Sequence, residues 1–303
     1  MALLKRGATL QDSGLPDRTT MSIGLKHLND YLVKKRDVIM PKETHGVDQN
    51  IDFTSYTMLN YYRNPLNHYF FNESLIVCSL MSFGVDNVWK NGVNADELFL
   101  RTCYVAHLIK REEVLQNYIT DKTRNVFDDT LAFMQSQRLM TVAADQEGHM
   151  RVHPKSSGEA TMLLIGSICW PLIDTYYVCS VYALSLVKRK DVEDEKFSHD
   201  VQWVAETMYQ EGKLNYFESS NQMVINGAKA QLLQMRVLEK KSIYINLAGE
   251  YQKAEGEKRL EKLIETINNY RNVPMNQRAF EEFNTDGELR RSVFSDFPIM
   301  AKL

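Results

Sequence analysis

The strongest constraint on the fold is a local pattern that occurs twice, a helix that leads directly into a short β-hairpin. In the first occurrence an amphipathic helix is predicted over Asp121–Gln137, and two β-prone runs follow it, Leu139–Val142 and His149–Val152. The residues between these runs, Asp145-Gln146-Glu147-Gly148, are typical of a tight turn. This stretch therefore predicts a helix joined to a hairpin.

The second occurrence follows later in the chain, with a helix over Asn221–Met235 and β-prone runs at Val237–Lys240 and Ile243–Leu247. The two hairpins begin at Leu139 and Val237, 98 residues apart, which is too long a period for a solenoid. No stronger repeat is visible in the sequence. We predict a mostly α-helical protein, a multi-helix domain with two short β-hairpins that resemble winged-helix elements.

We predict that the rest of the chain is mainly helical. The run Asn94-Ala95-Asp96-Glu97 has a capping residue followed by acidic residues in the first turn, as expected at a helix N-terminus. Ser156–Val187 is an apolar middle segment, Lys188–Glu195 is predicted to be a charged loop, and Glu250–Arg271 is a charge-rich helix with one packed face. We divide the chain into a tail and helix over residues 1–50, a helical region over 51–272 and a polar tail over 273–303.

Composition narrows the class of protein. The 303 residues are 44% hydrophobic and 25% charged, an ordinary globular balance. The formal charge of -3 and the pI of about 6.2 argue against a protein that binds nucleic-acid phosphates. No secretory or transit signal is recognisable, and the longest apolar stretch, Met162–Val187, is broken by Pro171 and Asp174.

The four cysteines are widely spaced in apolar surroundings, so we interpret them as free thiols in a reducing compartment rather than as zinc ligands or disulfides. They are Cys78, Cys103, Cys169 and Cys179. His149 and His153 have no further ligands nearby, and no phosphate-binding loop or dinucleotide motif occurs. We therefore expect no metal and no cofactor.

Two short segments carry a resemblance to a known family. The first is Tyr61-Tyr62-Arg63-Asn64 with His68, ahead of a long apolar helix, and the second is Tyr216-Phe217-Glu218. Both resemble the C-terminal region of glycerol-3-phosphate and dihydroxyacetone-phosphate acyltransferases. The similarity covers Ile51–Leu247, and we identify the chain with the dihydroxyacetone-phosphate branch. The resemblance implies acyl transfer from acyl-CoA to the sn-1 hydroxyl of dihydroxyacetone phosphate, in ether-lipid and glycerophospholipid synthesis.

The catalytic motif of that family is H-x-x-x-x-D, in which the Asp orients a His that removes the hydroxyl proton. None of the seven histidines is followed by Asp at the required spacing. The histidines are His27, His45, His68, His107, His149, His153 and His199, and the residues at that spacing are Leu32, Asn50, Glu73, Glu112, Pro154, Gly158 and Val204. Only His68–Glu73 and His107–Glu112 come close, and we interpret both as surface or packed histidines. We therefore assign no catalytic residue.

The resemblance places the catalytic core N-terminal to this region, so we expect the chain alone to be non-catalytic and to act through a catalytic region or subunit. Acyl-CoA and dihydroxyacetone phosphate would be bound only by that core, and a peripheral membrane contact is possible. Three explanations stay open: a short isoform or fragment, a supporting module for a catalytic partner, or a repurposed pseudoenzyme. A non-enzymatic structural or interaction subunit is the alternative function, and nucleic-acid binding through the winged-helix-like elements is the less favoured one.

The C-terminal tripeptide Ala301-Lys302-Leu303 is a variant of the Ser-Lys-Leu peroxisomal address, in which a receptor holds the side chains and the free carboxylate. The dihydroxyacetone-phosphate branch of the family is the peroxisomal one. We therefore expect a peroxisomal location and a peroxisomal import receptor as partner, with the mitochondrion as the alternative.

Overall fold

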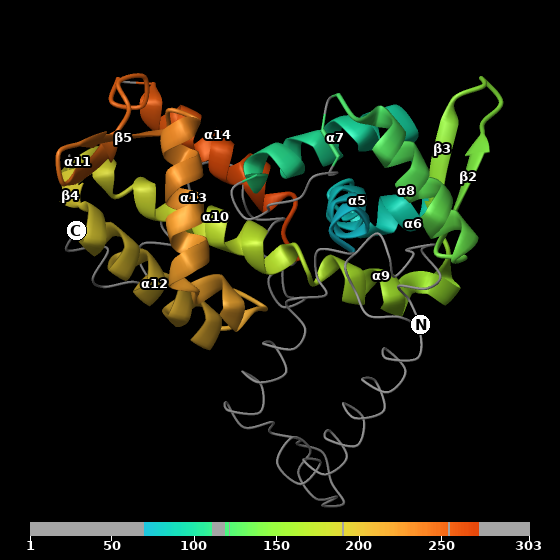
Figure 1. Ribbon diagram of the computed structural model, residues 1–303, viewed down its shortest axis with the longest axis horizontal. Coiled ribbons are helices and arrows are strands. Elements are labelled where there is room, and N and C mark those ends of the chain that lie inside the picture. Colours follow the sequence, from blue (N-terminus) through green and yellow to red (C-terminus); the bar gives the residue numbers. More distant parts are fainter. Residues whose placement is uncertain (1–69, 111–118, 121, 190, 254, 273–303) are drawn as a thin grey trace, which may run out of the picture. The chain divides into compact units, whose positions relative to one another are not determined.

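The computed structural model describes residues 70–110, 119–120, 122–189, 191–253 and 255–272 (Figure 1). From Phe71 onward these residues belong to one compact unit. Its architecture is mostly helical with two small antiparallel sheets, which confirms the predicted fold class.

The first half of this unit, which we call repeat 1, runs from α5 to α9. Its sheet has the strand order β1-β3-β2, with β1 and β2 both antiparallel to β3. After the central helix α5, a helix, a short strand, two helices and a hairpin follow one another, which is the connectivity of a winged helix. The elements are α5 (Phe71–Met81), α6 (Val85–Asn91), β1 (Val93–Asn94), α7 (Ala95–Leu108), α8 (Arg124–Ser136), β2 (Met140–Ala144), β3 (Met150–Pro154), a 3-10 turn (Ser156–Gly158) and α9 (Glu159–Gly166).

The second half, repeat 2, runs from α10 to α14 and presents its α-helices and strands in the same order; only the 3-10 turn stands at a different place. Its strand order, β4-β6-β5, is the counterpart of the first sheet. The elements are α10 (Trp170–Ala183), α11 (Leu186–Arg189), β4 (Asp191–Glu193), α12 (Asp194–Gln210), a 3-10 turn (Phe217–Ser220), α13 (Gln222–Gln234), β5 (Leu238–Lys241), β6 (Tyr244–Leu247) and α14 (Gly256–Asn268). The recurrence that the sequence showed only at the hairpins therefore extends over the whole unit as a tandem duplication.

The end of α8 and the end of α13 show how closely the repeats correspond. Leu139 donates its backbone N–H to Met134 over 3.1 Å, and Val237 does the same to Leu232 over 2.9 Å. In both turns the preceding residue is an arginine in the left-handed region, with φ of 60° in repeat 1 and 56° in repeat 2. These are the same helix C-cap, 98 residues apart.

The buried face of α7 recurs on α12 at an offset of 99 residues. Four buried positions of α7 correspond to four buried positions of α12, with residues of similar size. The pairs are Leu98 and Phe197, Thr102 and Val201, Val105 and Val204, and Ala106 and Ala205. The duplication therefore preserves the apolar pattern, although few residues are identical.

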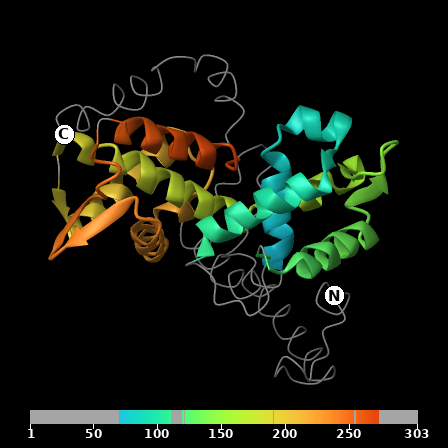
Figure 2. The same cartoon turned by 90° about the horizontal axis from the view of Figure 1, so that it is seen from above.

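A helix with nearly all of its residues buried forms the centre of each repeat. Figure 1 looks nearly along the axis of α5, which contacts α7, α8 and α9. In repeat 2 the central helix is α10, and in Figure 2 α14 (orange-red) runs alongside it. The predicted apolar middle segment is thus the pair α9 and α10. In the described part of the chain no helix alone is long and apolar enough to cross a bilayer, although α9 with α10–α11, bent by 54°, matches a broken span in length and composition.

The prediction of a charged loop over Lys188–Glu195 is wrong. This segment contains the end of α11, the strand β4 and the first residues of α12. Val192 is buried and faces Ile245 across the sheet, while Asp191 and Glu193 on either side are exposed. A strand of only three residues at the edge of a sheet is stabilised by its pairing with the hairpin. Its own sequence therefore does not distinguish it from a loop.

Candidate functional site

The described histidines lie outside any cleft suited to general-base catalysis. His149 Nδ1 is 3.6 Å from Glu147 Oε2 and 3.9 Å from Asp145 Oδ1, but its side chain is 59% exposed on the hairpin turn. His107 and His199 are exposed on α7 and α12. The ring of His153 packs on Gly92 and fills the space that a Cβ would need there, with its nearest ring atom 2.5 Å from the ideal Cβ position. Within the described residues, no imidazole is thus held by a carboxylate in an enclosed site.

The two pairs that resembled H-x-x-x-x-D at the sequence level do not reach catalytic geometry where the structure describes them. Glu73 is fully buried in the first turn of α5, and its partner His68 lies outside the described residues. His107 is in the last turn of α7, and Glu112 lies outside the described residues.

The family-signature residues Tyr61, Tyr62, Arg63 and Asn64 also lie outside the described residues. The second signature stretch, Tyr216-Phe217-Glu218, enters the 3-10 turn between α12 and α13. The hydroxyl of Tyr216 accepts a hydrogen bond from the side-chain amide of Asn272 over 3.1 Å. Phe217 packs edge-to-face on Tyr209, with ring centroids 5.5 Å apart. The stretch therefore fastens the turn to the C-terminal end of α14, which is a structural role.

Beside it lies a buried ion pair between Asp174 of α10 and Arg271. Arg271 Nε donates to Asp174 Oδ1 over 2.6 Å, and the two side chains are 0% and 4% exposed. The guanidinium also donates to Asn268 Oδ1 and to the carbonyl oxygen of Lys213, and it lies 4.0 Å from the ring centroid of Tyr177. Burial raises the pKa of Asp174, and Arg271 offsets part of that rise. The pair thus joins α10, the turn after α12 and the end of α14.

Sequence reasoning did not predict this ion pair. Its members are 97 residues apart, and Asp174 was visible only as a charge that interrupts an apolar run. Aligning the two repeats singles out Asp174, because its position in α10 corresponds to the apolar Leu75 in α5. A carboxylate at a core position requires a partner that the local sequence does not show.

A second polar cluster in repeat 2 also replaces apolar residues of repeat 1. Lys229 of α13 pairs with Asp194 and donates to Ser198 Oγ over 2.8 Å, and Lys240 pairs with the other oxygen of Asp194. Burial alone would raise the pKa of Asp194, but the two lysines outweigh it and lower the pKa. Leu131 stands at the position equivalent to Lys229.

Replacing Lys229 by leucine, the residue of repeat 1, is expected to lower the free energy of unfolding at pH 7 by about 1–2 kcal/mol, because the half-buried Asp194 loses a charged donor. A carboxyl with a lowered folded pKa stabilises the fold above its unfolded pKa and loses that effect as the pH falls. The variant should therefore show a weaker decline in stability between about pH 5 and pH 2. Urea unfolding across this range measures both effects. Lys241→Ala, which removes an exposed pair with Glu239, should change little, and equal pH profiles for wild type and Lys229→Leu would contradict the assignment.

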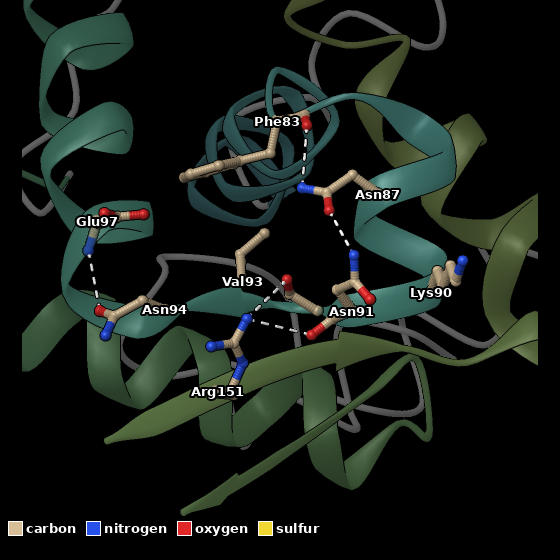
Figure 3. A pocket seen from close by; sticks show the side chains of 9 residues that line it. Phe83, Asn87, Lys90, Asn91, Val93, Asn94, Glu97 and Arg151 are labelled. Carbon is tan, nitrogen blue, oxygen red and sulfur yellow. Dashed lines mark hydrogen bonds between the residues drawn. The ribbon is translucent and has the colours of Figure 1, made fainter. Parts of the chain in front are cut away.

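An open pocket of about 810 Å³ lies on repeat 1, between α6, β1, the start of α7 and β3 (Figure 3). Arg151 of β3 donates to the carbonyl oxygens of Asn91 and Gly92 over 3.2 and 3.4 Å. Side chains from all four elements line it: Phe83, Asn87, Lys90, Asn91, Val93, Asn94, Glu97 and Arg151, with the backbone of Gly92. Sequence reasoning missed this site because its residues form no recognisable motif.

The cysteines are the other reactive side chains among the described residues. The thiols of Cys78, Cys169 and Cys179 are buried, Cys103 is half-buried, and none of the four forms a disulfide. Burial raises the pKa of the Cys78 thiol, which disfavours the reactive thiolate. In the part of the chain that the structure describes, no three His, Cys, Asp or Glu side chains are placed to hold a metal ion.

Comparison with known proteins gives one family. The model for the glycerol-3-phosphate acyltransferase C-terminal region matches residues 1–241. No curated protein matches the chain. With most of its length matched, the chain belongs to the glycerol-3-phosphate acyltransferase C-terminal family, among the acyltransferases of lipid biosynthesis.

Proposed function

We propose that this chain is a supporting, non-catalytic C-terminal module of an acyltransferase that acylates dihydroxyacetone phosphate at the sn-1 position, in ether-lipid synthesis. The observation that carries the proposal is the family match over residues 1–241, in a sequence where no histidine is followed by the Asp of H-x-x-x-x-D. The exposed or packed state of the described histidines supports it.

In this view, repeat 2 acts as a rigid support. Its signature residues Tyr216 and Phe217 and the Asp174–Arg271 pair join three separate segments around a buried helix. A catalytic region gains from such support because reacting groups must be held in a fixed geometry. The acyl-CoA and the phosphorylated acceptor are then bound by the catalytic partner.

The proposal is tested by adding the purified chain to a separately purified catalytic region of a dihydroxyacetone-phosphate acyltransferase. We expect a stable complex and a rise in acylated product from dihydroxyacetone phosphate, with a smaller rise from glycerol 3-phosphate. A winged-helix domain of another family is the control. Failure to bind or to raise the rate sinks the proposal, and a preference for glycerol 3-phosphate reassigns the substrate.

For the location we propose the peroxisome, through Ala301-Lys302-Leu303, which lies outside the described residues. A fluorescent protein fused to the N-terminus leaves the terminal carboxylate free, so the fusion should colocalise with a peroxisomal marker. Removal of the three residues should disperse it, whereas Lys302→Arg, which keeps the cation, should not. Unchanged localisation after the deletion rejects the address, and mitochondrial signal favours the alternative location.

The alternative function is a non-enzymatic interaction subunit, and tandem winged-helix repeats are the observation in its favour. Nucleic acid is the less suitable partner, because α8 exposes Asp128 and Asp129 and the first hairpin turn carries Asp145 and Glu147. Filter binding at low salt distinguishes the two cases, since tight and salt-sensitive binding would favour nucleic acid.

A further inference from the structure

The duplication allows the pocket of repeat 1 to be compared with the equivalent place in repeat 2. At an offset of 99 residues, Phe83 corresponds to Tyr182, Lys90 to Arg189 and Arg101 to Asp200. In repeat 2 the three side chains at these positions interact with one another through a hydrogen bond and an ion pair. In repeat 1 the equivalent side chains do not.

In repeat 2 a built-in carboxylate occupies the site. Tyr182 is fully buried and donates its hydroxyl hydrogen to Asp200 Oδ2 over 2.6 Å. The same oxygen lies 3.9 Å from Arg189 Nη1. One carboxylate therefore accepts a hydrogen bond from the ring hydroxyl and balances the cation at the end of α11.

Repeat 1 keeps the cation and loses the carboxylate. Arg101 stands at the position of Asp200. It donates to the carbonyl oxygen of Ser82 over 2.8 Å and to the hydroxyl of Ser82 over 2.9 Å. Its guanidinium lies 3.7 Å from the ring centroid of Phe83, which lines the pocket and has no hydroxyl. Among the described residues, Lys90 has no hydrogen-bonding or ionic partner.

The remaining lining suits a polar anion. Arg151 contributes a second cation. Its Nη2 donates to the carbonyl oxygens of Asn91 and Gly92, and its Nη1 lies 3.9 Å from Asp145 Oδ2 in the hairpin turn, which leaves further N–H groups of the guanidinium as donors. Three asparagines line the walls, and in Figure 3 Glu97 lies on the α7 side while Lys90 lies at the end of α6. The carboxylate of Glu97 repels a bare anion next to it but accepts hydrogen bonds from hydroxyl groups.

We propose that the pocket of repeat 1 binds a small ligand with one anionic group, a phosphate or carboxylate, on a hydroxylated body. The anionic group lies near Lys90 and Arg151, where it takes the role that Asp200 has in repeat 2. The hydroxyl groups contact Asn94 and Glu97. The same chemistry occurs in a free phosphorylated polyol and in a phospholipid headgroup.

Amide chemical shifts of Gly92 and Asn94 in the full chain, labelled with nitrogen-15, test the site. The probes are inorganic phosphate, glucose 6-phosphate and phosphatidylcholine vesicles containing phosphatidic acid, each against sodium chloride of equal ionic strength. We expect saturable shifts, with glucose 6-phosphate binding more tightly than inorganic phosphate. Binding to the vesicles alone assigns the site to a lipid headgroup, and binding to the soluble phosphates assigns it to a free ligand.

Two variants make the test specific. Lys90→Gln should weaken binding about tenfold, the effect of one charge-assisted hydrogen bond. Phe83→Tyr with Arg101→Asp rebuilds the internal carboxylate of repeat 2 and should abolish binding without unfolding the chain. Lys196→Gln, an exposed lysine at the position equivalent to Glu97, is the control and should bind as wild type. No saturable shift with any probe, or equal affinity in Lys90→Gln, overturns the proposal.

Discussion

Replacing Arg271 by methionine is expected to lower the free energy of unfolding by about 3–5 kcal/mol, because it leaves the buried Asp174 carboxylate without its counter-ion. Asp174 is 0% exposed, and its second oxygen, Oδ2, has no hydrogen-bond partner among the described residues. A marginally stable protein does not tolerate a loss of that size easily. Guanidinium chloride unfolding followed by circular dichroism measures it.

The pH dependence of this variant has a defined sign. Without Arg271 only burial acts on Asp174, so its folded pKa rises further above the unfolded value of about 3.9. A carboxyl with a raised folded pKa binds its proton more tightly in the native state. The deficit relative to wild type should therefore be full at pH 7 and should shrink as the pH falls through the raised pKa.

The matched control comes from repeat 1, where Leu75 occupies the position of Asp174. The double variant Asp174→Leu with Arg271→Met should recover most of the stability, since replacing both members of a buried ion pair with apolar residues is often neutral or stabilising. If the double variant is as unstable as Arg271→Met alone, Arg271 acts through its bonds to Asn268 and Lys213 rather than through the charge of Asp174.

Replacing Trp170 by alanine is expected to lower the free energy of unfolding by about 3–5 kcal/mol, the usual effect of removing a large buried ring. Trp170 is 2% exposed at the start of α10, and its ring lies so close to Gly166 that a Cβ there would come within 2.6 Å of it. Chemical unfolding provides the measurement, with Trp203→Ala as control. Trp203 is 42% exposed, so its removal should change stability far less.

Repeat 1 again indicates the tolerated substitution. Phe71 holds the equivalent position at the start of α5 and is 3% exposed. In the described residues Trp170 Nε1 is buried without a hydrogen-bond acceptor, so Trp170→Phe also removes an unsatisfied donor. We expect it to retain most of the stability. A loss as large as that of Trp170→Ala would show that the indole is required and that the two positions are not equivalent.

The sequence predicted well those features that depend on neighbouring residues. The hairpin turn forms as expected, with Asp145 Oδ1 accepting hydrogen bonds from the backbone N–H groups of Glu147 and His149, and with Gly148 at a φ of 85°. Asn94 caps α7 by accepting from the N–H groups of Asp96 and Glu97. In each case the donor and the acceptor lie within four residues of one another.

Features that depend on contacts between residues far apart in the sequence could not be predicted from the local sequence. The strands β1 and β4 form only because β3 and β6 pair with them. The duplication was visible only at the hairpins, because equivalent positions such as Leu98 and Phe197 share apolar character rather than identity. The pocket is lined by Lys90 of α6 and Arg151 of β3, which lie 61 residues apart in the sequence and line one pocket only in the folded chain.

We propose that this polypeptide supports acyl transfer without performing it. The most direct measurement incubates the purified chain with radiolabelled acyl-CoA and dihydroxyacetone phosphate, and compares the product with that of a heat-inactivated sample. We predict no acylated product above the inactivated sample. Sustained formation of acyl dihydroxyacetone phosphate in proportion to the amount of native chain would show that the chain itself catalyses the transfer.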